Sequence, residues 1–113
     1  MAGMDVDDRF AAVVEALAGR PGVVPPGADG GRGFGSTALT VDGAIFAVPW
    51  HGALVLKLPA PRVRHLIEAG LGIPFDAGKG RPMREWVAIP AGSSSEDLDL
   101  AEEALSFVRS RSG

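Results

Sequence analysis

Residues 37–58 read T-A-L-T-V-D-G-A-I-F-A-V-P-W-H-G-A-L-V-L-K-L, and this stretch decides the fold. Three apolar runs, at residues 37–41, 44–50 and 53–58, are separated by the dipeptides Asp42-Gly43 and His51-Gly52. Asp-Gly between apolar runs is among the strongest short signals for a hairpin, because a two-residue turn needs residues that tolerate a positive φ. His-Gly offers a second turn one strand later. The pattern predicts an antiparallel meander of three strands.

Helical periodicity flanks this meander on both sides. A first amphipathic helix begins at residue 7 or 8 and ends before Gly19, and a last helix follows the capping serines at residues 93–95. Pro61 suits the first turn of a short middle helix, and residues 85–89 are predicted to form a further strand. The apolar positions that define the three helices are Phe10, Val13, Val14, Leu17, Val63, Leu66, Ile67, Leu98, Ala101, Leu105 and Val108. We expect an α+β fold in which N-terminal, middle and C-terminal helices cover a single layer of mostly antiparallel sheet, with about four or five strands.

The composition is that of one ordinary globular domain. The chain has 113 residues, 46% hydrophobic and 22% charged, which is enough to bury one core and too little for two. We predict a single domain over residues 1–113, with its core at about residues 7–110 and a flexible glycine- and proline-rich loop at about residues 20–35.

Charge and cysteine content exclude several classes of protein. The net charge of −3 is unsuited to a protein whose main task is to coat nucleic acid. Because there is no cysteine, disulfides, thiolate catalysis and cysteine-ligated metal clusters are excluded. Asp5, Asp7 and Asp8 stand where a secretory signal would need cations, and no run approaches the roughly 18 apolar residues of a membrane span. We expect a cytoplasmic protein with no membrane segment.

A basic and aromatic segment, F-D-A-G-K-G-R-P-M-R-E-W, occupies residues 75–86. The six cations from Lys57 to Arg84 face only Glu68 and Asp76, so this part of the chain carries six minus two, or +4. These cations are Lys57, Arg62, Arg64, Lys79, Arg81 and Arg84. They indicate a patch for an anion, either a phosphate backbone or an acidic protein surface. The alternative is a solvated loop in which Arg81 and Arg84 pair with Asp76 and Glu85.

The two tryptophans, Trp50 and Trp86, also have two interpretations. A tryptophan on a strand usually fills the core or covers a sheet edge. The alternative is that it stacks on a base or binds a partner beside Arg84.

Several segments resemble the family of TfoX N-terminal-like and YjbR (MmcQ)-like domains, which are small bacterial α+β domains. They are Phe34-Gly35-Ser36, Val41-Asp42-Gly43, the strand at residues 54–58 with its lysine, Arg81-Pro82-Met83, Arg84-Glu85-Trp86 and Phe107-Val108. The resemblance extends from about Phe10 to Val108. It departs at residues 27–33, where the loop is expanded, and at Gly33, where relatives commonly carry methionine.

What the family implies about function is limited. Its members include part of a competence regulator and proteins described as DNA-binding, and we expect the present chain to lack the second domain of full-length TfoX proteins. The resemblance therefore implies a fold but no reaction.

Motifs for catalysis and cofactors are incomplete. The G-K-G at residues 78–80 lacks both the first glycine and the Ser or Thr of a phosphate-binding P-loop, and residues 31–36 lack the third glycine of a dinucleotide fingerprint. A triad of Ser36, a histidine and Asp76 has no supporting motif, and neither histidine has partners at metal-ligand spacing. We expect no enzymatic activity, no cofactor and no metal.

These observations predict a non-enzymatic cytoplasmic module that binds a macromolecule. The expected binding residues are Lys57, Lys79, Arg81, Arg84 and Trp86, and the expected partner is a protein. One alternative is a DNA-binding regulatory domain, and a second is a small-ligand protein or an enzyme of unknown activity. An exposed sheet edge also leaves homodimerisation open.

Overall fold

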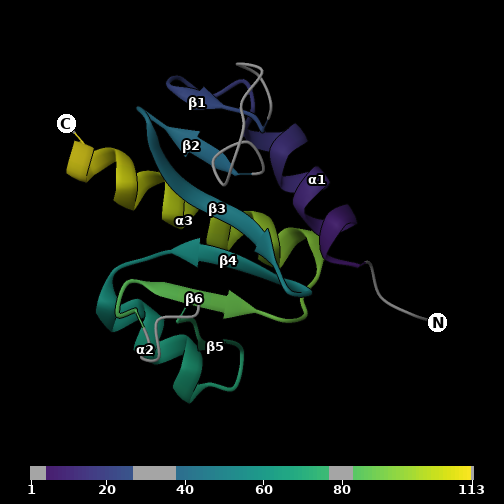
Figure 1. Ribbon diagram of the computed structural model, residues 1–113, viewed down its shortest axis with the longest axis vertical. Coiled ribbons are helices and arrows are strands. Elements are labelled where there is room, and N and C mark those ends of the chain that lie inside the picture. Colours follow the sequence, from purple (N-terminus) through teal and green to yellow (C-terminus); the bar gives the residue numbers. More distant parts are fainter. Residues whose placement is uncertain (1–4, 27–37, 77–82, 113) are drawn as a thin grey trace.

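The computed structural model describes residues 5–26, 38–76 and 83–112 and confirms the α+β architecture (Figure 1). These residues form three helices and one antiparallel sheet of six strands in the order β1-β2-β3-β4-β6-β5. The elements are α1 (Val6–Leu17), β1 (Val23–Val24), β2 (Leu39–Val41), β3 (Ala44–Trp50), β4 (Ala53–Lys57), α2 (Ala60–Glu68), β5 (Ile73–Pro74), β6 (Trp86–Ile89) and α3 (Ser94–Ser112).

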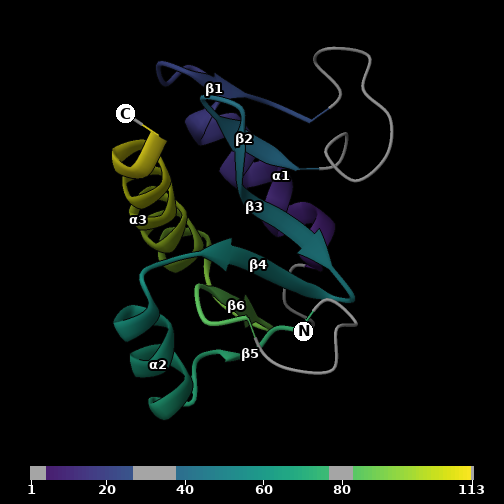
Figure 2. The same cartoon turned by 60° about the vertical axis from the view of Figure 1, so that its left-hand side comes forward.

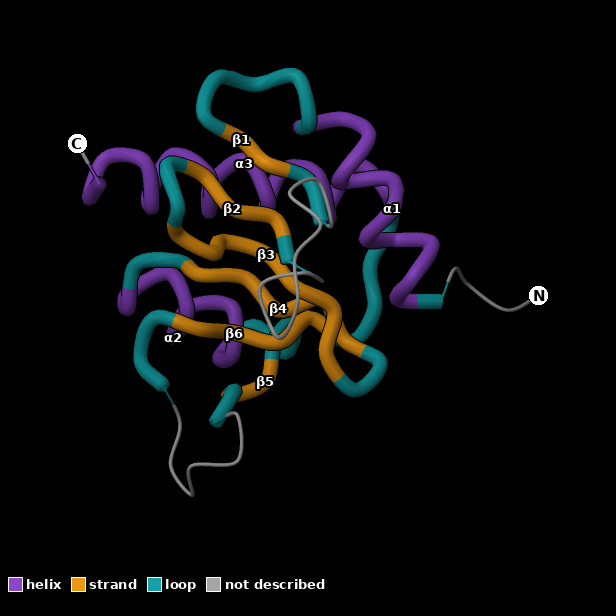
Figure 3. The backbone as a smooth tube through the Cα atoms, turned by 45° about the horizontal axis from the view of Figure 1, so that its top comes forward, coloured by secondary structure: helices purple, strands orange, loops and turns teal. Residues whose placement is uncertain are grey.

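The expected number of strands, four or five, was too low. The additional strands are β1 and β5, which have two residues each and lie at the two edges of the sheet (Figure 3). A strand of two residues has no periodicity to recognise, because its existence depends only on pairing with a neighbour. Such short edges, one of them containing Pro74, leave few free backbone groups to continue the sheet into a second molecule.

Both predicted hairpin turns are confirmed. Asp42 and Gly43 have φ values of 52° and 86°, and His51 and Gly52 have φ values of 49° and 81°. Two consecutive residues with positive φ give the tight turn whose twist matches that of antiparallel strands. The three strands β2, β3 and β4 are therefore joined as the sequence indicated.

A bulge in β3 sends two adjacent side chains to the same face of the sheet. The pairing of β2 with β3 passes from Leu39↔Ala47 to Thr40↔Ile45, so Phe46 is the extra residue. Side chains otherwise alternate between faces, but Phe46 and Ala47 both enter the core beneath the helices.

All three helices cover this one face of the sheet (Figures 1 and 2). Helices α1 and α3 pack on each other and on β3 and β4, whereas α2 packs on β6 and β5. Leu54 and Leu56 of β4 contribute to the large core on this face, while Val55 points to the opposite face. No helix within the described ranges has the length and apolar character needed to cross a membrane.

The opposite face carries a smaller apolar cluster with both tryptophans. Val48, Val55, Ala88 and others are buried there, and Trp50 and Trp86 pack against them half-buried. The ring of Phe75 contacts the ring of Trp50 edge-on, with 5.9 Å between the ring centroids. It also contacts the tilted ring of Trp86, with 6.3 Å between the centroids. The tryptophans therefore pack against the cluster and keep part of their surface exposed.

A buried ion pair joins the first helix to the last. The Nε and NH2 groups of Arg9 each donate to a different carboxylate oxygen of Asp97 at 2.8 Å, and NH1 donates to the carbonyl oxygen of Ile89 at 3.1 Å. Arg9 is 2% exposed and Asp97 is 1% exposed. Gly92 makes room for this contact, since a Cβ there would lie 2.8 Å from Asp97 Oδ1. The pair fixes the start of α3 against α1 and the end of β6.

Candidate basic and aromatic site

Three of the five predicted binding residues lie together on the described surface. Lys57, Arg84 and Trp86 line one shallow hollow of about 500 Å³, together with Ala60, Met83 and Glu85. Lys57 and Trp86 are direct partners in the pairing of β4 with β6, and Lys57 Nζ lies 5.4 Å from the centroid of the Trp86 ring. Lys79 and Arg81 fall outside the described residues. We call the described set Lys57, Met83, Arg84 and Trp86 the basic-aromatic surface.

Backbone hydrogen bonds hold the turn that presents Arg84. Met83 N donates to the carbonyl oxygen of Phe75 at 2.8 Å, and Trp86 N donates to that of Met83 at 3.2 Å. Leu58 N donates to the carbonyl oxygen of Glu85 at 3.0 Å, which ties the turn to the end of β4. Arg84 is thus exposed at the tip of a fixed turn, beside the half-buried Trp86.

A second hollow lies on the other side of the same turn. It has a volume of about 350 Å³ and shares Ala60, Met83, Arg84 and Trp86 with the first. Its outer wall is α2, which contributes Arg64 and Glu68. The side chains of Met83, Arg84 and Trp86 therefore separate two adjoining depressions, and an approaching partner would meet cations from both sides.

The predicted cluster of six cations is not one patch. Arg62 faces away from the basic-aromatic surface and makes a two-pronged ion pair with Glu103 of α3, at 2.9 Å and 3.1 Å. The proposed pairing of Arg84 with Glu85 is also wrong, because Glu85 accepts hydrogen bonds from Arg111 at 2.7 Å. Among the described residues, Arg84 has no hydrogen-bond or ion-pair partner. Its guanidinium is available to an external carboxylate or phosphate.

The described residues contain no group of three or more histidine, cysteine, aspartate or glutamate side chains able to hold a metal ion. His51 stacks on Trp50, and His65 Nδ1 lies 3.0 Å from Arg62 NH1. Ser36, the hypothetical nucleophile, falls outside the described residues. The described site presents a guanidinium, an ammonium group and an aromatic ring, which are groups suited to binding.

The methionine of this surface was not among the predicted binding residues. Met83 is joined to Phe75 and Trp86 by backbone hydrogen bonds and lines both hollows. Its place in the segment Arg81-Pro82-Met83 was the only available signal, and that segment alone does not show which way a methionine points.

Comparison of the chain with protein-family models, with curated proteins and with solved structures gives no match. The resemblance to TfoX N-terminal-like and YjbR-like domains therefore stays a prediction.

Proposed function

We propose that the chain is a non-enzymatic, cytoplasmic binding module of the TfoX N-terminal-like or YjbR-like type, and that it binds a protein through the basic-aromatic surface. Lys79 and Arg81 belong to the same proposed site by sequence. The observation that carries the proposal is the guanidinium of Arg84, which has no hydrogen-bond or ion-pair partner among the described residues and is held on a fixed turn beside Trp86. The ammonium group of Lys57 lies over the ring of the same tryptophan.

The residue types favour a protein partner. Arginine and tryptophan are the side chains most enriched among residues that dominate the energy of protein interfaces. Arg84 can bind a carboxylate through two parallel hydrogen bonds, and the exposed part of Trp86 offers an apolar contact next to it. A partner with an acidic residue beside an apolar one fits both groups.

Duplex DNA is the alternative partner. Lys57, Arg64 and Arg84 converge on the two hollows and could contact phosphates. The net charge of −3 opposes this alternative, because affinity for DNA comes largely from neutralising its phosphates.

Capture from a bacterial lysate tests the proposal. The tagged wild-type chain should retain a partner that the Arg81→Ala/Arg84→Ala variant loses, with at least about a ten-fold drop in recovery. The matched control is Arg20→Ala, which removes an exposed arginine that lines neither hollow. Equal capture by all three proteins would refute the proposal.

A DNA titration distinguishes the two partners. Mixed-sequence duplex is added at about 50 mM and about 200 mM salt, and tryptophan fluorescence and gel mobility are followed. Binding that weakens steeply with salt, and that the double variant loses, would replace the protein proposal with the DNA alternative.

A further inference from the structure

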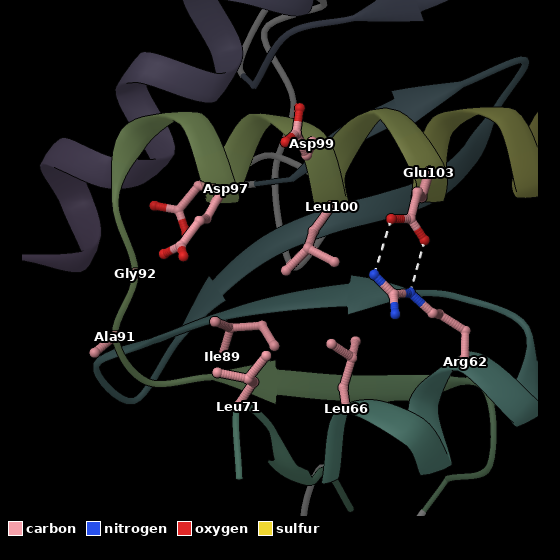
Figure 4. Close-up of a pocket in the computed structure, with 11 residues that line it drawn as sticks. Arg62, Leu66, Leu71, Ile89, Ala91, Gly92, Asp97, Asp99, Leu100 and Glu103 are labelled. Carbon is pink, nitrogen blue, oxygen red and sulfur yellow. Dashed lines mark hydrogen bonds and ion pairs between the residues drawn. The ribbon is translucent and has the colours of Figure 1, made fainter. Parts of the chain in front are cut away.

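A separate pocket lies between α2, α3 and the end of β6 (Figure 4). Its volume is about 240 Å³, and it shares no lining residue with the two hollows of the basic-aromatic surface. Figure 4 shows Leu66 and Leu71 rising from below toward Leu100 of α3, with Ile89 beside them. These four side chains form an apolar floor.

The exposed part of this floor is held in place by the end of α2. Leu71 is 57% exposed, which is unusual for so large an apolar side chain. Gly70 has a φ of 78°, Gly70 N donates to the carbonyl oxygen of Ile67, and Leu71 N donates to that of Leu66 at 3.0 Å. This is the hydrogen-bond pattern that ends a helix with a left-handed residue, and it brings the side chains at Leu71 and Leu66 together. Leu71 is therefore fixed at the rim by its backbone.

The rim on the α3 side is acidic. Glu96, Asp99 and Glu103 lie on one side of α3 at helical spacing. Among the described residues that line the pocket, Arg62 of α2 is the only cation, which leaves three minus one, or −2. Asp97 adds nothing to this balance, because Arg9 neutralises it in the core.

The three carboxylates of the rim differ in whether they already form hydrogen bonds or ion pairs within the protein. Glu96 accepts a hydrogen bond from Ser93 N in the capping box of α3, and Glu103 binds Arg62 (Figure 4). Asp99 is exposed and has no hydrogen-bond or ion-pair partner among the described residues, and in Figure 4 its side chain extends from the top of α3, on the side away from Leu66 and Leu71. It is the carboxylate most available to an external cation.

We propose that this pocket is a second protein-docking site, and that it takes a large apolar side chain flanked by lysine or arginine from a short segment of a partner. The apolar floor would contact the large apolar side chain of the partner. The negative charge of the rim favours lysine or arginine next to that side chain. The pocket is smaller than the roughly 300 Å³ at which small-molecule sites begin, and its size suits one side chain.

Selection from a displayed library of random short peptides tests this proposal. Peptides enriched on the wild-type protein should carry a large apolar residue next to lysine or arginine. Leu71→Ser should lower the affinity for the enriched peptides about ten-fold, which is the loss expected when a central apolar contact is removed. Asp99→Asn should lower this affinity by a smaller factor. Both side chains are exposed, so neither change should unfold the protein, and far-UV circular dichroism checks this.

The chain offers a matched control for each change. Ile73→Ser removes an apolar side chain that is 50% exposed in the same segment but lines no part of the pocket, and Asp7→Asn removes an exposed carboxylate from α1. Both controls should keep full affinity. The proposal is overturned if no such peptide motif is enriched, or if the selected peptides bind Leu71→Ser and Ile73→Ser equally. Enriched acidic peptides that depend on Arg84 would instead report on the basic-aromatic surface.

Discussion

Asp97→Asn should be the most destabilising conservative change in this protein that removes no apolar group. The substitution keeps the shape of the side chain but leaves the guanidinium of Arg9 buried without a counter-charge, since both of its strongest contacts are to Asp97. Removing one partner of a buried, hydrogen-bonded pair costs about 3–5 kcal/mol. Domains of this kind are stable by only about 5–15 kcal/mol, so the loss would be a large fraction of the free energy of unfolding.

Urea unfolding followed by tryptophan fluorescence and circular dichroism measures the effect. With a dependence on urea of about 2 kcal/mol per molar, a loss of about 4 kcal/mol lowers the midpoint by about 2 M. The control is Glu103→Gln, which breaks the exposed pair with Arg62 and should cost at most about 1 kcal/mol. Trp50 and Trp86 report the transition in both variants without any added probe.

A double variant separates the loss of charge from the loss of shape. Arg9→Met/Asp97→Leu replaces both charged groups with apolar ones and should recover most of the stability lost in Asp97→Asn, because no unpaired buried charge remains. If Asp97→Asn is as mild as Glu103→Gln, or if the double variant is no more stable than the single one, the electrostatic reasoning is refuted.

Two further changes test the local geometry. Asp5→Ala removes the carboxylate that accepts a hydrogen bond from Asp8 N at the start of α1 and should cost about 1 kcal/mol in the same urea experiment, whereas Asp7→Ala should cost less. Gly72→Ala places a Cβ 2.5 Å from Cγ2 of the buried Val87 and should lower the free energy of unfolding by about 1–3 kcal/mol. An unchanged urea midpoint would contradict this, because it would mean that the loop before β5 moves without cost.

The basic-aromatic surface and the acidic pocket are different surfaces of one small domain. The basic-aromatic surface presents Arg84 and Trp86 around the turn before β6, and the acidic pocket lies between α2 and α3. Helix α2 borders both regions. The variants Arg84→Ala and Leu71→Ser report on the two surfaces separately.

Features determined by a few adjacent residues were predictable from the sequence alone. Asp42-Gly43 and His51-Gly52 form the two tight turns because only local backbone preferences are involved, and Ser93 with Glu96 caps α3 for the same reason. The apolar spacing of the three helices likewise predicted which face of each is buried. These signals were sufficient for the α+β class.

Features that depend on residues far apart in the chain were decided only by the tertiary structure. Arg9 and Asp97 are separated by 88 positions, and nothing near either residue indicates that the other will neutralise it. The same holds for the ion pair of Arg111 with Glu85 and for that of Arg62 with Glu103. It also holds for the two-residue strands at the sheet edges. Each of these contacts forms because packing brings its partners together, whereas sequence patterns report the preferences of a single turn, helix or strand.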